Sequence, residues 1–220
     1  MTKEKIIKLI ALVLELFVFI TITYVIIKAI FFGYKFGDIV VPPYEFSYFR
    51  YFTNLSNILA GIVGLILFIY LLIHFKEDKP LPRWLSYLAL GAATGVGLTL
   101  LTVVFFLAPT YAMKGNSYFI MFGDDMLFTH LLNPLASCIA FALCIKHERI
   151  NFKQALFGII PMAVYACFYS PLVLSGVWDD FYGFTFGGNW WAIFLALPIM
   201  LCVTYLISFG LALTTHRRQK

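Results

Sequence analysis

Six long apolar runs, separated by short polar connections, dominate the pattern of this 220-residue chain. Each run has at least the roughly 20 residues that an α-helix needs to cross a bilayer. The runs cover residues 6–32, 49–75, 85–108, 124–145, 154–174 and 190–214. The pattern therefore predicts an all-α, polytopic integral membrane protein, in which six transmembrane helices form a bundle and the whole chain, 1–220, is a single domain.

The breaks between the runs, and the small residues within them, predict how the helices end and pack. The clearest break is 76–83, where charges and two prolines cannot continue a buried helix. Pro161 and Pro198 instead fall inside predicted spans, where neighbouring helices can satisfy the freed carbonyls, so we expect kinks there rather than ends. Gly91 and Gly95 predict a close helix–helix contact in the third run.

Composition and charge support the same class. Hydrophobic residues make up 62% of the chain and charged residues 12%, whereas a soluble domain has roughly half and about a quarter. Lys and Arg are retained on the cytoplasmic side of a membrane, and twelve of them fall on one side of the six-span arrangement. Both termini are therefore expected in the cytoplasm, and the net charge of +5 predicts no nucleic-acid partner. The twelve are Lys3, Lys5, Lys8, Lys76, Lys79, Arg83, Lys146, Arg149, Lys153, Arg217, Arg218 and Lys220.

Targeting signals and familiar enzyme motifs add little. The first run begins like a signal peptide, but it is too long and lacks a small-residue cleavage site, so we expect it to be retained. Cysteines inside spans behave as small hydrophobes rather than as disulfide partners or metal ligands. No metal-binding spacing, phosphate loop or soluble-hydrolase motif occurs, so neither a metal nor a cofactor is expected. The four cysteines are Cys138, Cys144, Cys167 and Cys202.

Polar residues interrupt the second run near its start. Arg50, Thr53 and Asn57 recur at positions i, i+3 and i+7, which places them on one face of a helix, and Asn54 lies beside them. Strongly polar groups at membrane depth are costly and usually mark a site. Structural roles remain open: the Thr53 hydroxyl could bond to its own helix, the two asparagines could join helices, and Arg50 could reach the membrane surface.

The fourth run carries a matching stripe of His130, Asn133 and Ser137. At 1.5 Å per residue, Thr53 lies roughly 6 Å and His130 roughly 9 Å inside the outer ends of their helices, so the two can share one depth. A hydroxyl and an imidazole at one depth can act as a nucleophile and its base. An interhelical hydrogen bond is the structural alternative for His130 and for Asn133. The two stripes predict an enclosed pocket near the outer leaflet for an amphiphilic substrate.

Three segments carry a resemblance to a known family. They are 51–57, His130 with Pro134, and the aromatic, glycine-rich turn 181–188. In these segments the chain resembles the androgen-induced and androgen-dependent TFPI-regulating membrane proteins, and in particular their bacterial relatives. The resemblance implies a six-helix threonine hydrolase in a bacterial cytoplasmic membrane. Members of the eukaryotic branch cleave fatty acid esters of hydroxy fatty acids with a threonine on helix two and a histidine on helix four, which correspond to Thr53 and His130.

The residues and the resemblance together lead us to expect an intramembrane lipid-ester hydrolase. His130 would take the proton of Thr53, which would attack the ester carbonyl. Asn54, Asn57 or Asn133 would donate to the oxyanion, and Arg50 would hold an anionic head group. Two alternatives remain open. The same pair could serve an acyltransferase, or the stripes could line a lipid-binding or transport path, although the two halves show no convincing inverted repeat.

Overall fold

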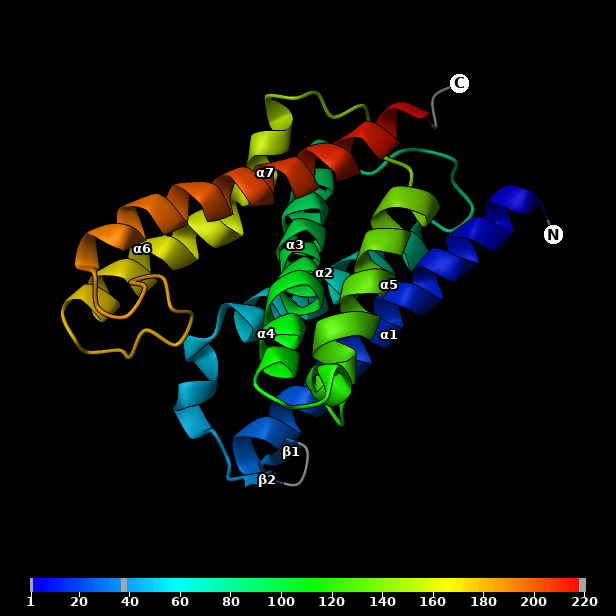
Figure 1. Ribbon diagram of the computed structural model, residues 1–220. Helices are drawn as coiled ribbons and strands as arrows, with labels where there is room; N and C mark the ends of the chain where they lie inside the picture. Colours follow the sequence, from blue (N-terminus) through cyan, green and yellow to red (C-terminus); the bar gives the residue numbers. More distant parts are fainter. Residues whose placement is uncertain (1, 37–38, 218–220) are drawn as a thin grey trace.

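A computed structural model of the protein describes residues 2–36 and 39–217. Its regular structure is almost entirely helical (Figure 1). Five helices in the described part are long and apolar enough to cross a membrane, and they match five of the six predicted runs. They are Lys3–Phe31, Phe52–Ile73, Arg83–Met113, Gln154–Leu174 and Trp190–His216. Arg218, Lys220 and the side chain of Arg217, which contribute to the predicted cytoplasmic charge, lie outside the described structure.

The predicted fourth span is present as a shorter apolar helix, Phe128–Cys144. Its 17 residues correspond to about 25 Å, somewhat less than the roughly 30 Å hydrocarbon core of a bilayer. The helix begins a few residues later than predicted, because a bend and a turn occupy residues 123–125 after the 3₁₀ turn Tyr118–Phe122. Two π-helical segments, Phe128–Leu132 and Ala140–Cys144, enclose the short helix α5, Asn133–Ile139.

The other elements follow in chain order. They are α1 (Lys3–Phe31), a 3₁₀ turn (Glu45–Arg50), α2 (Phe52–Ile73), α3 (Arg83–Thr102), a π segment (Val103–Leu107), α4 (Ala108–Met113), a 3₁₀ turn (Gln154–Ile159), α6 (Ile160–Leu174), a 3₁₀ turn (Trp190–Ala192) and α7 (Ile193–Arg217). Helices α6 and α7 run side by side, as the yellow and orange ribbons of Figure 1 show.

A small β-hairpin follows α1, where the sequence predicted only helix and loop. Strand β1, Tyr34–Phe36, pairs antiparallel with β2, Ile39–Val41. Gly33 separates α1 from the hairpin and has φ +74, a left-handed conformation that favours glycine. A Cβ atom at Gly33 would also lie 2.2 Å from the carbonyl oxygen of Val41. Glycine therefore permits the tight turn from helix into hairpin.

Two prolines explain two of the π-helical segments. Pro109 follows the segment Val103–Leu107 by two residues, and Pro134 follows Phe128–Leu132 by the same interval. A proline inside a helix has no N–H to donate, and its ring clashes with the carbonyl four residues earlier. For Pro134 that carbonyl belongs to His130. The preceding turn widens to avoid the clash, which gives the π-helical geometry that often marks functional sites.

Pro161 and Pro198, the two prolines expected to kink their spans rather than end them, occupy different positions in their helices. Pro161 lies in the first turn of α6, just after the 3₁₀ turn Gln154–Ile159. At that position its missing N–H has no intrahelical partner to lose. Pro198 lies within α7, which continues as one helix from Ile193 to Arg217. The prediction that neither proline ends its apolar segment is confirmed.

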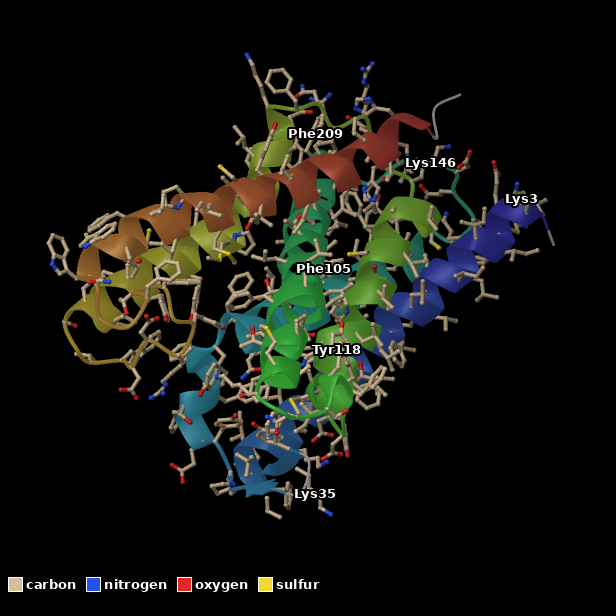
Figure 2. The ribbon with its side chains drawn as sticks, viewed as in Figure 1. Lys3, Lys35, Phe105, Tyr118, Lys146 and Phe209 are labelled. Atoms are coloured by element: carbon tan, nitrogen blue, oxygen red, sulfur yellow. The ribbon has the colours of Figure 1, made fainter. Side chains whose placement is uncertain are left out.

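The helices alternate in direction, so the start of α1 and the end of α2 lie together. The Lys8 ammonium donates to the His74 carbonyl at 2.9 Å, and the Leu81 N–H donates to the Lys146 carbonyl at 2.9 Å. Lys146 lies at this end in Figure 2, and Lys35 of the hairpin lies at the opposite end. We call the two ends the lysine-rich end and the hairpin end. The first is named for Lys3, Lys5, Lys8, Lys76, Lys79 and Lys146.

Helix α3 occupies the centre of the bundle, and its small residues allow close contacts on two sides. A Cβ atom at Gly95 would lie 3.3 Å from Cβ of Ser56 in α2, and one at Gly91 would lie 3.5 Å from Cγ of Pro161 in α6. The close helix contact predicted from the two glycines is therefore confirmed, and it involves two neighbours rather than one.

The loop 175–189 between α6 and α7 is organised around a single carboxylate. Asp180 accepts hydrogen bonds from the Tyr169 hydroxyl (2.6 Å), the Phe184 N–H (3.0 Å), and both the N–H and the hydroxyl of Thr185 (2.6 Å each). Burial alone would raise the pKa of Asp180, but the donated hydrogen bonds outweigh it and hold the pKa below its ordinary value of 3.8. The ionised carboxylate therefore fixes the loop to α6.

Replacing Gly158 by alanine should destabilise the packing of the 3₁₀ turn Gln154–Ile159 against α7. The added Cβ would lie 2.1 Å from Oγ and 2.7 Å from Cβ of Ser208, and 2.9 Å from Oγ1 of Thr94, so backbone must move. We expect a loss of about 1–3 kcal/mol, measured as a lower thermal unfolding midpoint in detergent. Gly210→Ala in α7, where nothing lies within 4 Å of the new methyl group, is the control and should not lower it. Equal midpoints for Gly158→Ala and wild type would contradict the close contact.

Asp180→Asn should destabilise the loop in a pH-dependent way. The native carboxyl has a lower pKa than the unfolded one, so its stabilisation is complete above the unfolded pKa and is lost as the pH falls through the native pKa. The difference in unfolding midpoint between wild type and variant should therefore be largest near pH 7 and shrink below about pH 4. Asp179→Asn makes the same charge change next door. A loss of equal size in that control, or one independent of pH, would refute the role of Asp180.

Candidate active site

Thr53 is the second residue of α2 and is half-buried. Helical threonines often bond to a carbonyl four residues back, as Thr21 does to Phe17 at 2.8 Å. For Thr53 the equivalent positions lie before the helix begins. Within the described residues no hydrogen bond joins its hydroxyl to a carbonyl of its own helix. The position at the helix start therefore leaves this hydroxyl without a bond to its own helix, unlike that of Thr21.

His130 lies in the π-helical segment before α5, and only 9% of its surface is exposed. Its Nδ1 atom is 2.7 Å from the carbonyl oxygen of Met121. A carbonyl can only accept, so Nδ1 carries the proton and Nε2 of the neutral ring has a free lone pair. In the described part of the chain, Nε2 has no hydrogen-bond partner. His130 is therefore held in the tautomer that a general base at Nε2 requires.

One cavity of about 320 Å³ at the hairpin end brings these two residues together. Thr53 of α2 and His130 of the π-helical segment before α5 both line this cavity. Asn54, Asp125 and Thr129 add further polar groups. The cavity is also lined by phenol hydroxyls, which can donate or accept hydrogen bonds without carrying charge. These come from Tyr34, Tyr44, Tyr48, Tyr51, Tyr111 and Tyr182.

A second cavity, of about 360 Å³, adjoins the first and has a different chemical character. Thr53, Leu107 and Tyr182 line both cavities, so Thr53 lies where the two meet. The second cavity lies among α3, the following π segment, α6 and α7, and its wall is mostly apolar. Its apolar residues include Leu98, Val103, Phe106, Met162, Ala196, Ile199 and Met200. Thr53 is therefore placed between a hydroxyl-rich space and an apolar one.

Tyr182 connects the loop 175–189 to the start of α2. Its hydroxyl accepts a 2.8 Å hydrogen bond from the Phe52 N–H, one of the donors that a helix start leaves unpaired. Burial raises the pKa of Tyr182 to about 12, although the nearby amides of Phe52 and Thr53 and the Thr53 hydroxyl partly oppose this. The phenol is therefore neutral at pH 7. It lies close to the Thr53 hydroxyl and restrains the first turn of α2.

Arg50 and Asn54 have different positions relative to the cavity. Asn54 lines it, and its Nδ2 donates to the Tyr48 carbonyl at 2.9 Å. Arg50 is not among the lining residues. Its guanidinium lies over the ring of Phe181, 5.7 Å from the ring centre, and the Tyr165 hydroxyl donates to its carbonyl at 2.8 Å. Of these two predicted site residues, only Asn54 borders the space between Thr53 and His130.

Asn57 and Asn133 are fully buried and do not line either cavity. The amide nitrogen of Asn57 donates to the carbonyls of Thr53 (2.8 Å) and Thr129 (3.0 Å), which joins α2 to the helix that carries His130. The amide oxygen of Asn133 accepts a 2.6 Å hydrogen bond from Thr21 of α1. Both residues therefore connect helices behind the site, the structural alternative considered for them.

Tyr48 and Asp125 add two further groups to the cavity, and neither was a predicted site residue. Tyr48 is 2% exposed, and its hydroxyl has no hydrogen-bond partner within the described residues. Burial first, and then the charge of Asp125, raises the pKa of Tyr48 above its ordinary value, so the phenol remains a donor. Asp125 is itself paired with the Lys28 ammonium at 2.8 Å. The sequence marks both only as polar residues near predicted helix ends, because their contacts depend on distant segments.

The described residues hold no evident metal centre, and the chain has no match among known proteins. Across residues 2–36 and 39–217, no group of three or more His, Cys, Asp or Glu side chains is arranged to hold a metal ion. No known protein-family model, curated protein or solved structure matches this chain. The function of the cavity must therefore be inferred from the side chains that line it.

Proposed function

We propose that this protein is an intramembrane lipid-ester hydrolase that uses Thr53 as nucleophile and His130 as general base. In this proposal the helix Phe128–Cys144 also crosses the membrane, as the fourth of six spans. The lysine-rich end and both termini face the cytoplasm, following the bias of positive charge. A helix of 17 residues spans a membrane that thins locally around it. The cavity that holds Thr53 and His130 then lies toward the outer leaflet.

The observation that carries the proposal is the hydrogen bonding of Thr53 and His130, which line the same cavity. Thr53 has no hydrogen bond to its own helix within the described residues, and His130 is oriented by the Met121 carbonyl with Nε2 unpaired. This arrangement matches the logic of a nucleophile, a base and a third group that orients the base. The Met121 carbonyl takes the place that a carboxylate has in the more familiar triads.

The chemistry follows in two balanced steps. His130 Nε2 takes the hydroxyl proton as Thr53 Oγ1 bonds to the ester carbonyl carbon, and the alcohol leaves with that proton when the tetrahedral intermediate collapses. A water molecule then gives its proton to His130 and attacks the acyl–Thr53 ester, which releases the fatty acid and restores the hydroxyl. The neutral Tyr48 phenol and the Asn54 side chain are the nearby donors available to the oxyanion.

The two adjoining cavities favour an amphiphilic ester as substrate. An acyl chain would occupy the apolar cavity between α3 and α7, and the polar alcohol portion would occupy the hydroxyl-rich cavity. The scissile carbonyl would then lie beside Thr53, where the cavities meet. Burial of the chain supplies binding energy remote from the reacting bond, at about 0.8 kcal/mol for each methylene group.

The packing of the bundle favours an enzyme over a transporter. The cavity at Thr53 and the cavity of about 350 Å³ between α1 and α2 at the lysine-rich end share no lining residue. Between them the side chains of Ala60, Val63 and Leu67 in α2 belong to the main apolar core, and each is at most 3% exposed. A transport path would need polar or open space at this depth.

A fluorophosphonate probe should label Thr53 in the purified, detergent-solubilised protein. Oγ1 would displace fluoride from phosphorus, and His130 would accept the hydroxyl proton. We expect Thr53→Ala to abolish labelling and His130→Ala to slow it at least about 1,000-fold, because removal of either member of such a pair disables the nucleophile. Intact-mass spectrometry over time measures the rate.

Thr53→Ser and Thr110→Ala provide the matched controls for this experiment. Serine keeps the hydroxyl and should retain labelling, whereas Thr110 lies outside the site, bonded to its own helix at 2.6 Å, and its loss should change nothing. All variants should unfold within a few degrees of wild type. Labelling of folded Thr53→Ala at the wild-type rate, or no labelling of the folded wild type, would reject the proposal.

Tyr182→Phe should slow labelling about tenfold without weakening probe binding. The substitution leaves the Phe52 N–H without its acceptor and removes a group beside Thr53, and one such hydrogen bond corresponds to about 1–1.5 kcal/mol. We expect a lower maximal rate at an unchanged half-saturating probe concentration. Tyr205→Phe, which removes a 3.1 Å hydrogen bond to the Phe152 carbonyl far from the site, is the control. A rate equal to that of wild type would show that Tyr182 does not position Thr53.

A further inference from the structure

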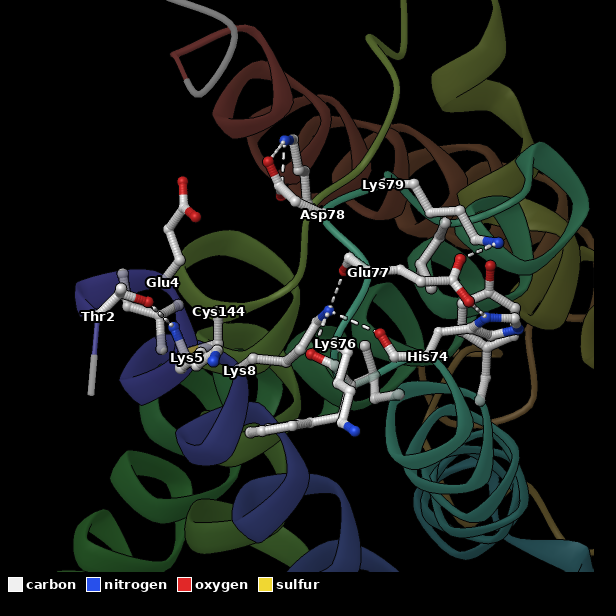
Figure 3. A pocket seen from close by; sticks show the side chains of 16 residues that line it. Thr2, Glu4, Lys5, Lys8, His74, Lys76, Glu77, Asp78, Lys79 and Cys144 are labelled. Atoms are coloured by element: carbon white, nitrogen blue, oxygen red, sulfur yellow. Dashed lines mark hydrogen bonds and ion pairs between the residues drawn. The ribbon is translucent and has the colours of Figure 1, made fainter.

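A separate cavity of about 350 Å³ opens at the lysine-rich end, away from the proposed active site. The start of α1, the end of α2 and the following connection form most of its wall (Figure 3), and Lys146 also lines it. Charged side chains dominate the rim, while Ile7, Tyr70 and Leu71 give it an apolar floor. A space of this size accommodates a small polar ligand or the head of a larger one.

Most of the charges around this cavity already have partners. Lys146 pairs with Asp78 at 2.9 Å, and Lys79 and His74 both pair with Glu77. Hydrogen bonds from Lys79 first, and then from His74, lower the pKa of Glu77 to about 2, so this carboxylate stays ionised and paired at neutral pH.

Lys8 has a structural role in the same wall. Its ammonium donates to three carbonyls at the end of α2 and just beyond, those of His74 (2.9 Å), Phe75 (3.3 Å) and Glu77 (2.5 Å). His74 caps the end of α2, and Phe75 and Glu77 follow it in the connection, so the positive charge of Lys8 also offsets the helix dipole there. Lys8 therefore contributes charge to the cavity but has no donor left for a ligand.

Lys5 and Lys76 are the remaining lysines on the cavity wall. Both are exposed, and neither forms an ion pair with any described residue. The five lysines that line the cavity outnumber its three carboxylates, Glu4, Glu77 and Asp78, so the wall carries an excess of two positive charges. Unpaired ammonium groups on opposite elements, α1 and the connection after α2, can converge on one anion.

We infer that this cavity is a binding site for a phosphate-bearing anion, held by Lys5 and Lys76. Phosphate presents several acceptor oxygens and a charge that matches the excess on the wall, and lysine is a common partner for it. The apolar floor lies against helices with the composition of membrane spans, which suits the glycerophosphate head of an anionic phospholipid. Free phosphate offers the same oxygens without the acyl chains.

Thermal unfolding of the purified protein in a neutral detergent tests this site. The probes are phosphatidylglycerol and phosphatidylcholine, both with eight-carbon chains, and inorganic phosphate. We expect phosphatidylglycerol to raise the unfolding midpoint of wild type, and less so at high salt because the lysines are exposed. In the double variant Lys5→Gln/Lys76→Gln, which lacks both charged donors, an equal rise in the midpoint should need an at least about tenfold higher lipid concentration.

Lys3→Gln/Lys153→Gln makes the same change in net charge with exposed lysines that do not line the cavity, and it should respond like wild type. Each single glutamine variant should lie between wild type and the double variant. A midpoint shift with phosphatidylglycerol alone assigns the site to a lipid head group, and an equal shift with inorganic phosphate assigns it to a free anion. No shift with either anion, or a shift that Lys5→Gln/Lys76→Gln retains in full, overturns the inference.

Discussion

The hydrogen bond between the Phe52 N–H and the Tyr182 hydroxyl joins parts of the chain that the candidate site needs together. It attaches the first turn of α2, and with it Thr53, to the loop before α7. That loop is in turn held to α6, because Asp180 accepts a hydrogen bond from Tyr169. A second contact, from the Tyr165 hydroxyl to the Arg50 carbonyl, ties α6 directly to the segment before α2. Thr53 is therefore positioned by three elements, although only one of them contains it.

The second half of the site depends on a constraint of the backbone rather than on a side-chain contact. Pro134 prevents a regular α-helical turn over the preceding residues, and the Asn133 N–H bonds to the Phe128 carbonyl, five residues back. The wider turn contains His130, whose ring then meets the Met121 carbonyl of the preceding 3₁₀ turn. One proline thus places the imidazole, and a carbonyl outside the helix selects its tautomer.

The sequence predicted the parts of this arrangement that depend on local pattern. Apolar runs located the long helices, and helical rise placed Thr53 and His130 at one depth, where they line one cavity. The rest of each polar stripe could not be assigned from spacing. Of the stripe residues only Thr53 and His130 line the cavity, whereas Asn57 is enclosed between helices. The role of Tyr182 was not predictable because its contact spans 130 residues, and the three-residue strands of the hairpin are too short to show an alternating pattern.

The two ends of the bundle differ in how their positive charges are used, and the ligands proposed for the two cavities follow this difference. At the hairpin end, Lys28 is engaged by Asp124 and Asp125, and Arg50 lies over an aromatic ring, so the cavity presents mainly neutral hydroxyls. At the lysine-rich end, the cationic side chains outnumber the carboxylates. A buried charge without a partner would be expensive at the first end, whereas exposed ammonium groups are inexpensive at the second. The fold therefore suits an uncharged polar group near Thr53 and an anion at the opposite end.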